Sequence, residues 1–293
     1  MTQETRSIRS DSGNASQAAP ARADNRIIGR VLLIFVIFLL LRFCVQSLLV
    51  ILTMTLAQTL PDAARDALIV TKEGEFLDFT GNAMVVISGI SFAVCGLCIF
   101  KKALSYAGKY TVKKDESPVF AALSCLAAAF LAVSLNILIA KSGIMQMSEG
   151  YQETAEIQYS CSFLIGIVIY GIVTPLSEEL LFRGIIYNGI KAFLSWKPAM
   201  ILCSVLFAVY HGNGVQGIYA LLMSLFFVYL YEKSGNFLVP VLMHSVSNIA
   251  AYILTYVYVP GTGGDIAMIA GAVLWGACFA VLLAWDRIKI RKK

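Results

Sequence analysis

The stretch Pro175-Leu-Ser-Glu-Glu-Leu-Leu-Phe-Arg183 places three charged side chains inside an apolar segment of the chain. Ionisable groups are costly inside a membrane segment, and each one there is by default a functional hypothesis. Glu179 and Arg183 are four residues apart, so they share one helical face and can form an ion pair. Glu178 points about 100° away from that face, where it is available for chemistry. Pro175 lacks an N–H donor, and we therefore expect a kink in this helix.

The chain around this stretch has the composition of an integral membrane protein. Of its 293 residues, 58% are hydrophobic and 14% are charged, and the mean hydropathy is +0.76. Soluble domains carry about 25% charged residues, so a soluble enzyme or a disordered protein is disfavoured. The formal charge of +5 does not indicate a nucleic-acid partner, because the basic residues lie between apolar runs. The seven cysteines fall almost entirely inside apolar stretches, which favours buried thiols over disulfides.

Eight apolar segments predict an all-α fold, a polytopic bundle of about eight transmembrane helices. They cover residues 31–57, 82–100, 119–140, 161–182, 198–211, 215–231, 237–257 and 266–285. A spanning helix needs about 20 residues, so the fifth segment is short. We expect a membrane domain over residues 27–293. The preceding residues 1–26 are rich in Ser, Ala and Arg and predict a disordered cytoplasmic tail.

The charges between the segments predict how the chain crosses the membrane. Basic residues dominate the tail, the loop 101–118 and the C-terminal end, whereas acidic residues dominate the loops 58–81 and 141–160. Positive residues collect on the cytoplasmic side, so both termini are expected in the cytoplasm, as an even number of spans requires. The composition of the tail and the short loops favour a bacterial plasma membrane.

The other polar residues of the apolar segments gather at one depth. His211 follows Phe207 by four residues, and His244 precedes Asn248 by four. At about 1.5 Å per residue from the nearest cytoplasmic-side lysine, Glu178, His211 and His244 lie roughly 20, 21 and 17 Å deep. The matching depth predicts one shared site, with a turn after His211 that is buried in protein or lines a watery cavity.

These side chains suit the hydrolysis of a peptide bond. Glu178 can act as a general base toward a water molecule, which His211 can help to bind directly or through a metal. His244 and Asn248 can stabilise the oxyanion of the tetrahedral intermediate. If Zn²⁺ is bound, its ligands are Glu178, His211 and His244, with water in the open position. The helical H-E-x-x-H spacing is absent, so hydrolysis with and without a metal both stay open.

Two less specific interpretations compete with a catalytic one. The polar cluster can be a structural network, since membrane histidines often join helices through hydrogen bonds. Arg42, in the first segment, lies apart from the cluster and is expected to pack against another helix or to snorkel.

Together the motifs resemble those of a known family. Glu178-Glu179-x-x-x-Arg183, Phe207-x-x-x-His211 and His244-x-x-x-Asn248 resemble the three signature motifs of the CPBP family, also called the Abi family. This family comprises type II CAAX prenyl proteases and bacteriocin-processing enzymes. The resemblance covers about residues 161–257 and implies that this part is the catalytic core of an eight-helix intramembrane endopeptidase.

The resemblance also implies a role for each motif residue. Glu178 and His211 would activate water, and His244 and Asn248 would form the oxyanion site. Glu179 and Arg183 would support them. Family members are commonly named metalloproteases, although a metal-independent glutamate mechanism has also been argued.

The expected substrate is a membrane-associated protein or peptide within the lipid bilayer. Bacteria do not usually prenylate proteins, so a leader peptide, a membrane-bound regulator or a bacteriocin-related peptide is favoured over a CAAX substrate. The alternative is a non-enzymatic membrane scaffold or a small transporter that uses the same polar cavity. A transporter would more naturally show inverted repeats, and the sequence shows none.

Overall fold

The computed structural model describes residues 26–71, 77–110, 117–257 and 264–291. The expected tail over residues 1–26 lies outside the described residues except for Arg26, at which the first helix begins. The elements, in order, are α1 (Arg26–Ala57), α2 (Asp62–Asp66), β1 (Ile69–Thr71), β2 (Leu77–Phe79), α3 (Gly81–Tyr110), α4 (Pro118–Ser142), α5 (Glu149–Tyr159), α6 (Phe163–Val168), η1 (Ile169–Val173), α7 (Thr174–Glu179), η2 (Leu180–Tyr187), α8 (Asn188–Lys191), α9 (Trp196–Tyr210), α10 (Gly214–Ser234), α11 (Leu238–Val257) and α12 (Gly264–Arg291).

The expected all-α membrane bundle is confirmed. Among the described residues, seven helices are long and apolar enough to cross a membrane, and α9 is a shorter apolar helix. The elements α6 to α8 form one continuous helical segment over Phe163–Lys191. Outside the bundle, β1 and β2 form a small antiparallel hairpin in which Ile69 lies opposite Phe79. The protein is therefore an integral membrane protein.

Two segments expected to be loops are partly helical. Helix α3 continues to Tyr110, well into the expected loop 101–118. Helix α5 occupies much of the expected loop 141–160 and begins after Ser148, whose hydroxyl accepts a hydrogen bond from the backbone N–H of Tyr151. Such a cap satisfies one of the free N–H groups at the start of a helix.

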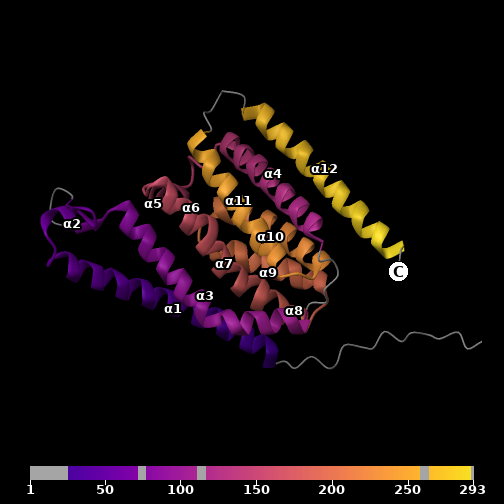
Figure 1. The fold of residues 1–293 in the computed structure, drawn as a ribbon, viewed down its shortest axis with the longest axis horizontal. Helices are drawn as coiled ribbons and strands as arrows, with labels where there is room; N and C mark the ends of the chain where they lie inside the picture. The colour runs from indigo at the N-terminus through magenta and orange to yellow at the C-terminus, as the bar shows by residue number, and fades with distance from the viewer. Residues whose placement is uncertain (1–25, 72–76, 111–116, 258–263, 292–293) are drawn as a thin grey trace, which may run out of the picture.

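The helices that surround the site occupy the middle of the bundle (Figure 1). Helix α12 packs along α4 on one flank, and α1 packs along α3 on the other. Helices α4, α7 and η1 all contact α11. The segment η2 contacts both α3 and α9. Residues that are far apart in the sequence therefore meet around the segment that carries the two glutamates.

This segment is an irregular helix. Two π-helical stretches, η1 and η2, flank the short α7, and Pro175 occupies the first turn of α7. A π-helical turn disturbs the regular hydrogen-bond ladder, and asparagine side chains bond to its carbonyl groups. Asn248 Nδ2 donates to the carbonyl of Tyr170 in η1 at 3.0 Å. Asn188 Nδ2 donates to the carbonyl of Arg183 in η2 at 2.6 Å. The kink expected at Pro175 stays a prediction, and the structure shows a π-helical stretch on either side of the short helix that contains this residue.

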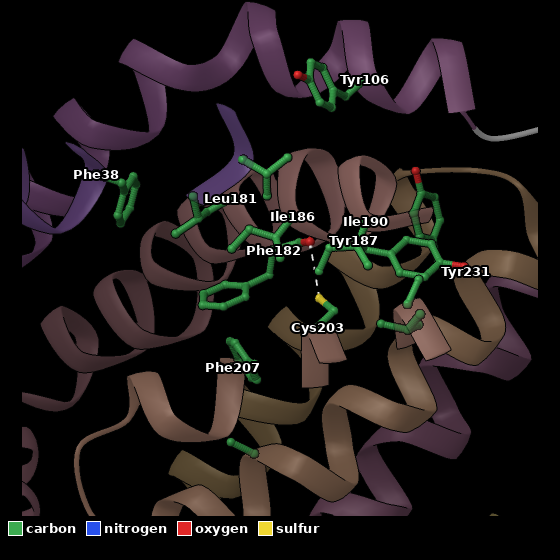
Figure 2. Packing of buried hydrophobic residues seen from close by; sticks show 14 of the residues in the cluster. Phe38, Tyr106, Leu181, Phe182, Ile186, Tyr187, Ile190, Cys203, Phe207 and Tyr231 are labelled. Carbon is green, nitrogen blue, oxygen red and sulfur yellow. Dashed lines mark hydrogen bonds between the residues drawn. The ribbon is translucent and has the colours of Figure 1, made fainter. Parts of the chain in front are cut away.

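The apolar side of η2 packs in the core that Figure 2 shows. Phe182 and Tyr187 lie among side chains of α1, α3, α9 and α10, which include Phe38, Tyr106 and Phe207. Gly184 permits close contact with α3, because a Cβ atom at this position would lie 2.7 Å from the Cβ of Ala103. Small residues allow helix backbones to approach in this way inside membranes.

The cysteines take no part in disulfides. All seven are free, and Cys203 Sγ donates a weak hydrogen bond to the carbonyl of Phe182 at 3.4 Å (Figure 2). Cys95, Cys161 and Cys203 are buried as expected, whereas Cys44 and Cys98 are exposed on the outer surface of the helices.

Candidate active site

The six polar residues predicted from the motifs come together from three parts of the chain. A cavity of about 570 Å³ lies between the helices, and Glu178, His211, His244 and Asn248 are among the residues that line it. Glu179 and Arg183 do not line the cavity and are completely buried beside it. The motif residues thus form two layers, one facing the cavity and one behind it.

The buried layer is built on the carboxylate of Glu179. Arg183 Nη1 donates to Glu179 Oε1 at 2.8 Å within the same helical segment. The other terminal nitrogen, Nη2, donates to the Ser224 hydroxyl of α10 at 2.9 Å. That hydroxyl donates in turn to Ser204 of α9 at 2.9 Å. The i,i+4 pair expected from the spacing is therefore present, and it is tied to two further helices.

His244 connects the two layers. Its Nδ1 lies 2.8 Å from Glu179 Oε1. An ionised carboxylate can only accept hydrogen bonds, so Nδ1 carries the proton in this contact. The opposite ring nitrogen, Nε2, lies 3.7 Å from Glu178 Oε2. His244 and Glu178 are each 5% exposed. The ring is therefore held by Glu179 on one side and faces the second glutamate on the other.

His211 lies at the end of α9. Its Nδ1 is 2.8 Å from the carbonyl oxygen of Phe207, one turn earlier. A carbonyl only accepts, so Nδ1 donates and Nε2 keeps a lone pair when the ring is neutral. The chain then reverses through Gly212, at φ +76°, and Asn213, whose side chain caps the start of α10. The turn expected after His211 is present, and His211 at its start lines the cavity.

Asn248 lies one turn after His244 on α11. One of its two amide N–H groups is used by the carbonyl of Tyr170. An asparagine amide has two N–H donors, so the second can serve a group inside the cavity. The hydrogen bond to η1 fixes the direction of the amide, and the same side chain lines the cavity.

The arrangement does not match a ligand set for zinc. Within the described ranges, no group of three or more His, Cys, Asp or Glu side chains is placed to hold a metal ion. Glu178, His211 and His244 line one cavity, but they do not form such a group. A tetrahedral zinc site needs its ligand atoms about 2 Å from the ion. The steps proposed below therefore use the residues of the chain alone.

Arg42 lies at the cavity, where the sequence pattern did not place it. Its guanidinium carbon lies 4.0 Å from the centre of the Phe92 ring, and the residue lines the cavity together with Glu178. Tyr210, next to His211, also lines it. Hydropathy marks Arg42 as an unusual charge in a membrane segment, but it does not show which neighbour the charge faces.

Helix α5 adds a polar edge to the cavity. Tyr151, Glu153 and Tyr159 belong to this helix and line the cavity. Burial raises the pKa of the Tyr151 and Tyr159 hydroxyls above the ordinary value of about 10. Both hydroxyls are therefore neutral at pH 7. The signal that identifies α5 in the sequence is the capping Ser148, followed by residues at i, i+4 and i+8 that face one side: Tyr151, Ala155 and Tyr159.

Comparisons with known proteins agree with the resemblance that the motifs indicate. Residues 160–250 match the family model described as type II CAAX prenyl endopeptidase, Rce1-like. The UPF0177 protein YxdF of Lactococcus lactis is 32% identical over 116 residues, which cover 39% of this chain and 64% of that protein. The protein named "Putative membrane peptidase YdiL" of Bacillus subtilis is 26% identical over 106 residues, 36% of this chain and 43% of that protein. No solved structure matches.

These matches confirm the family resemblance over the part of the chain that carries the motifs. They span less than two thirds of the length of either relative. The matched residues run from the start of the irregular helical segment into α11 and include both layers of the site. At the level of the family, the resemblance is to CAAX-type intramembrane proteases.

Removal of Arg183 should destabilise the protein. Breaking a buried ion pair typically costs about 3–5 kcal/mol, because the remaining charge is left uncompensated. We expect Arg183→Ala to lower the melting temperature in detergent. Arg183→Lys should recover only part of the loss, since it restores the charge without the two-donor geometry. The double change Glu179→Gln with Arg183→Met should melt above Arg183→Ala, because neither charge is left alone. If Arg183→Ala melts like the parent, the pair does not stabilise the fold.

Proposed function

We propose that this chain is an intramembrane endopeptidase that hydrolyses a peptide bond in a membrane-associated protein or peptide. The observation that carries the proposal is the pairing of two adjacent glutamates with one histidine. Glu179 orients His244 through Nδ1, and Glu178 lies 3.7 Å from Nε2 on the cavity side. A purely structural network would not need a second carboxylate that faces an open cavity.

The proposed reaction begins with a water molecule in the cavity. Glu178 accepts a proton from this water, and the resulting hydroxide attacks the carbonyl carbon of the scissile peptide bond. His211 Nε2 accepts a hydrogen bond from the same water and so helps to position it. Glu178 then returns the proton to the nitrogen of the leaving group as the carbon–nitrogen bond breaks.

His244 and Asn248 stabilise the negative charge that develops on the carbonyl oxygen. The free N–H of Asn248 can donate to this oxygen, and His244 donates when Nε2 is protonated. Pre-oriented donors at a developing oxyanion are worth about 2.7–4 kcal/mol each in known enzymes. Glu179 and Arg183 act as positioning residues, because they hold the His244 ring and do not themselves line the cavity.

The substrate would reach the cavity from the bilayer or from a membrane surface. The cavity lies between helices that are long and apolar enough to span a membrane. A membrane-bound peptide or a protein segment near the membrane can enter such a site. The lipid bilayer is therefore the immediate environment of both enzyme and substrate.

Replacing Glu178 tests the proposed activity. We expect Glu178→Gln to lose cleavage by about 100- to 10,000-fold, the usual contribution of a general base, while the protein stays folded. His211→Ala and His244→Ala should also lose cleavage. The measurement is mass spectrometry of new protein N-termini in the membrane fraction of the native host. The matched control is Glu153→Gln, a carboxylate of the same cavity to which the reaction assigns no role.

Three outcomes would contradict the proposal. Retained cleavage in Glu178→Gln would remove this residue as the base. If Glu153→Gln and Glu178→Gln lost cleavage alike, the effect would follow from the charge of the cavity and not from a base at residue 178. If the new N-termini were absent even from cells with the parent chain, the scaffold or transporter interpretation would be favoured.

The hypothesis of a bound zinc ion, which the motifs also suggested, is tested by removing the metal. Because the three expected ligands do not form a metal-binding group among the described residues, we expect the purified protein to keep its activity after zinc removal with a membrane-permeant chelator. Metal content measured by mass spectrometry accompanies the assay. Near-stoichiometric zinc in the parent, its loss in His211→Ala, and activity restored only by added zinc would instead establish a metal mechanism.

We also propose that both termini lie in the cytoplasm of a bacterial cell. The loop charges support this orientation, and α5 would then lie on the opposite side of the membrane. Met147, just before α5, is 85% exposed. A membrane-impermeant maleimide should label Met147→Cys in intact cells and should not label Lys109→Cys at the other end of the bundle. Labelling of the parent protein gives the background from the native cysteines. The reverse labelling pattern would show the opposite orientation, with both termini outside the cytoplasm.

A further inference from the structure

Arg42 is a cation deep in the membrane domain. It lies about 24 Å along α1 from Arg26, at about 1.5 Å per residue, and 15 residues remain before α1 ends at Ala57. The guanidinium packs over the Phe92 ring and lines the same cavity as Glu178. A charge at this depth is costly unless it is paired or serves the function of the protein.

No carboxylate of the described residues forms an ion pair with Arg42. Among the described residues, no Asp or Glu oxygen lies within 4 Å of its guanidinium, whereas Arg183 is paired with Glu179 at 2.8 Å. Among the same described residues, the buried Nε of Arg42 has no hydrogen-bond partner. Five N–H groups are available on an arginine, so this side chain can still donate to a ligand.

The surroundings of Arg42 suit a ligand with a single negative charge. Glu178 and Glu153 line the same cavity and would repel a ligand with two or more negative charges. Tyr210 also borders the cavity, and its buried hydroxyl interacts with the Arg42 side chain. A planar carboxylate fits an arginine fork through two parallel hydrogen bonds, and the Tyr210 hydroxyl can add a third.

We propose that Arg42 binds a carboxylate group of the peptide substrate. This inference rests on the proposed function and adds a specificity determinant to it. The carboxylate would be either the free C-terminus of the peptide or the side chain of an Asp or Glu. In both cases it neutralises the charge of the Arg42 guanidinium and holds the peptide in the cavity that contains Glu178. The enzyme would thereby select segments that carry an acidic group near the cleaved bond.

Binding of defined peptides tests the proposal without relying on cleavage. The probes are N-acetyl-Leu-Leu-Phe as the free acid, the same peptide as the C-terminal amide, and N-acetyl-Glu-Leu-Phe amide. Calorimetric titration of the full chain in lipid nanodiscs gives the Kd for each. We expect at least one of the two acidic probes to bind about ten- to a hundredfold tighter than the neutral amide. The acidic probe that binds tighter identifies the C-terminus or the side chain as the source.

Variants of α1 connect this preference to Arg42. Arg42→Gln should remove the preference for the acidic probe and leave the Kd of the neutral amide unchanged. Arg42→Lys should keep part of the preference, because the charge remains without the planar fork. Arg30→Gln removes an exposed charge from the same helix and should behave like the parent. Gln46→Leu, one turn from Arg42 on the cavity side, should also keep the preference.

The proposal would be overturned if the parent bound all three probes equally or bound neither acidic probe. It would also be overturned if Arg42→Gln lost affinity equally for all probes. A preference that also disappears in Arg30→Gln would overturn the proposal as well, because the effect would then follow from net charge.

The proposed activity is tested separately by the new N-termini. If the preference is present and the N-termini are absent, the carboxylate site stands and the peptidase function fails. If the N-termini are present without the preference, only the present inference fails.

Discussion

The shared carboxylate of Glu179 is the interaction on which the site depends. One oxygen accepts hydrogen bonds from both Arg183 and His244, and all three side chains are buried. The carboxylate needs compensation at this depth, and this need joins the irregular helical segment to α11. Arg183 extends the connection to Ser224 of α10. The position of the His244 ring relative to Glu178 is therefore a consequence of charge compensation behind the cavity.

The widened turns of the same segment contribute a second constraint. A π-helical turn leaves backbone carbonyls that need partners outside the usual ladder. Asn248 supplies one of these partners at Tyr170 and at the same time lines the cavity. A residue expected to act on the oxyanion is thus also needed to complete the helical segment that carries Glu178, the proposed base. Asn188 has the same structural task in η2, away from the cavity. A hydrogen bond from an asparagine side chain to a backbone carbonyl is therefore not, by itself, evidence that the asparagine takes part in the reaction.

The sequence pattern predicts well what depends on position along the chain. Hydropathy places the spanning segments, and i,i+4 spacing predicts the Glu179–Arg183 pair that the structure contains. It does not predict which helix faces which. Arg42 lies on a helix with apolar residues all around it, so its contact with the cavity depends on how α1 packs. Helix α5 is too polar to resemble a spanning segment, and the side that faces the cavity is recognised only from the helix cap and the residue spacing.

Phe207, the aromatic residue of the second motif, packs against several groups of the site. The Phe207 ring lies 4.7 Å from the centre of the His211 ring, 5.7 Å from that of His244 and 4.7 Å from the guanidinium carbon of Arg183. Its carbonyl also accepts from His211. Two adjacent glutamates must differ in their access to water if one is to hold a histidine and the other is to activate a water molecule. An apolar ring against the ion pair keeps water away from Glu179 and leaves Glu178 on the cavity side, where water can reach it.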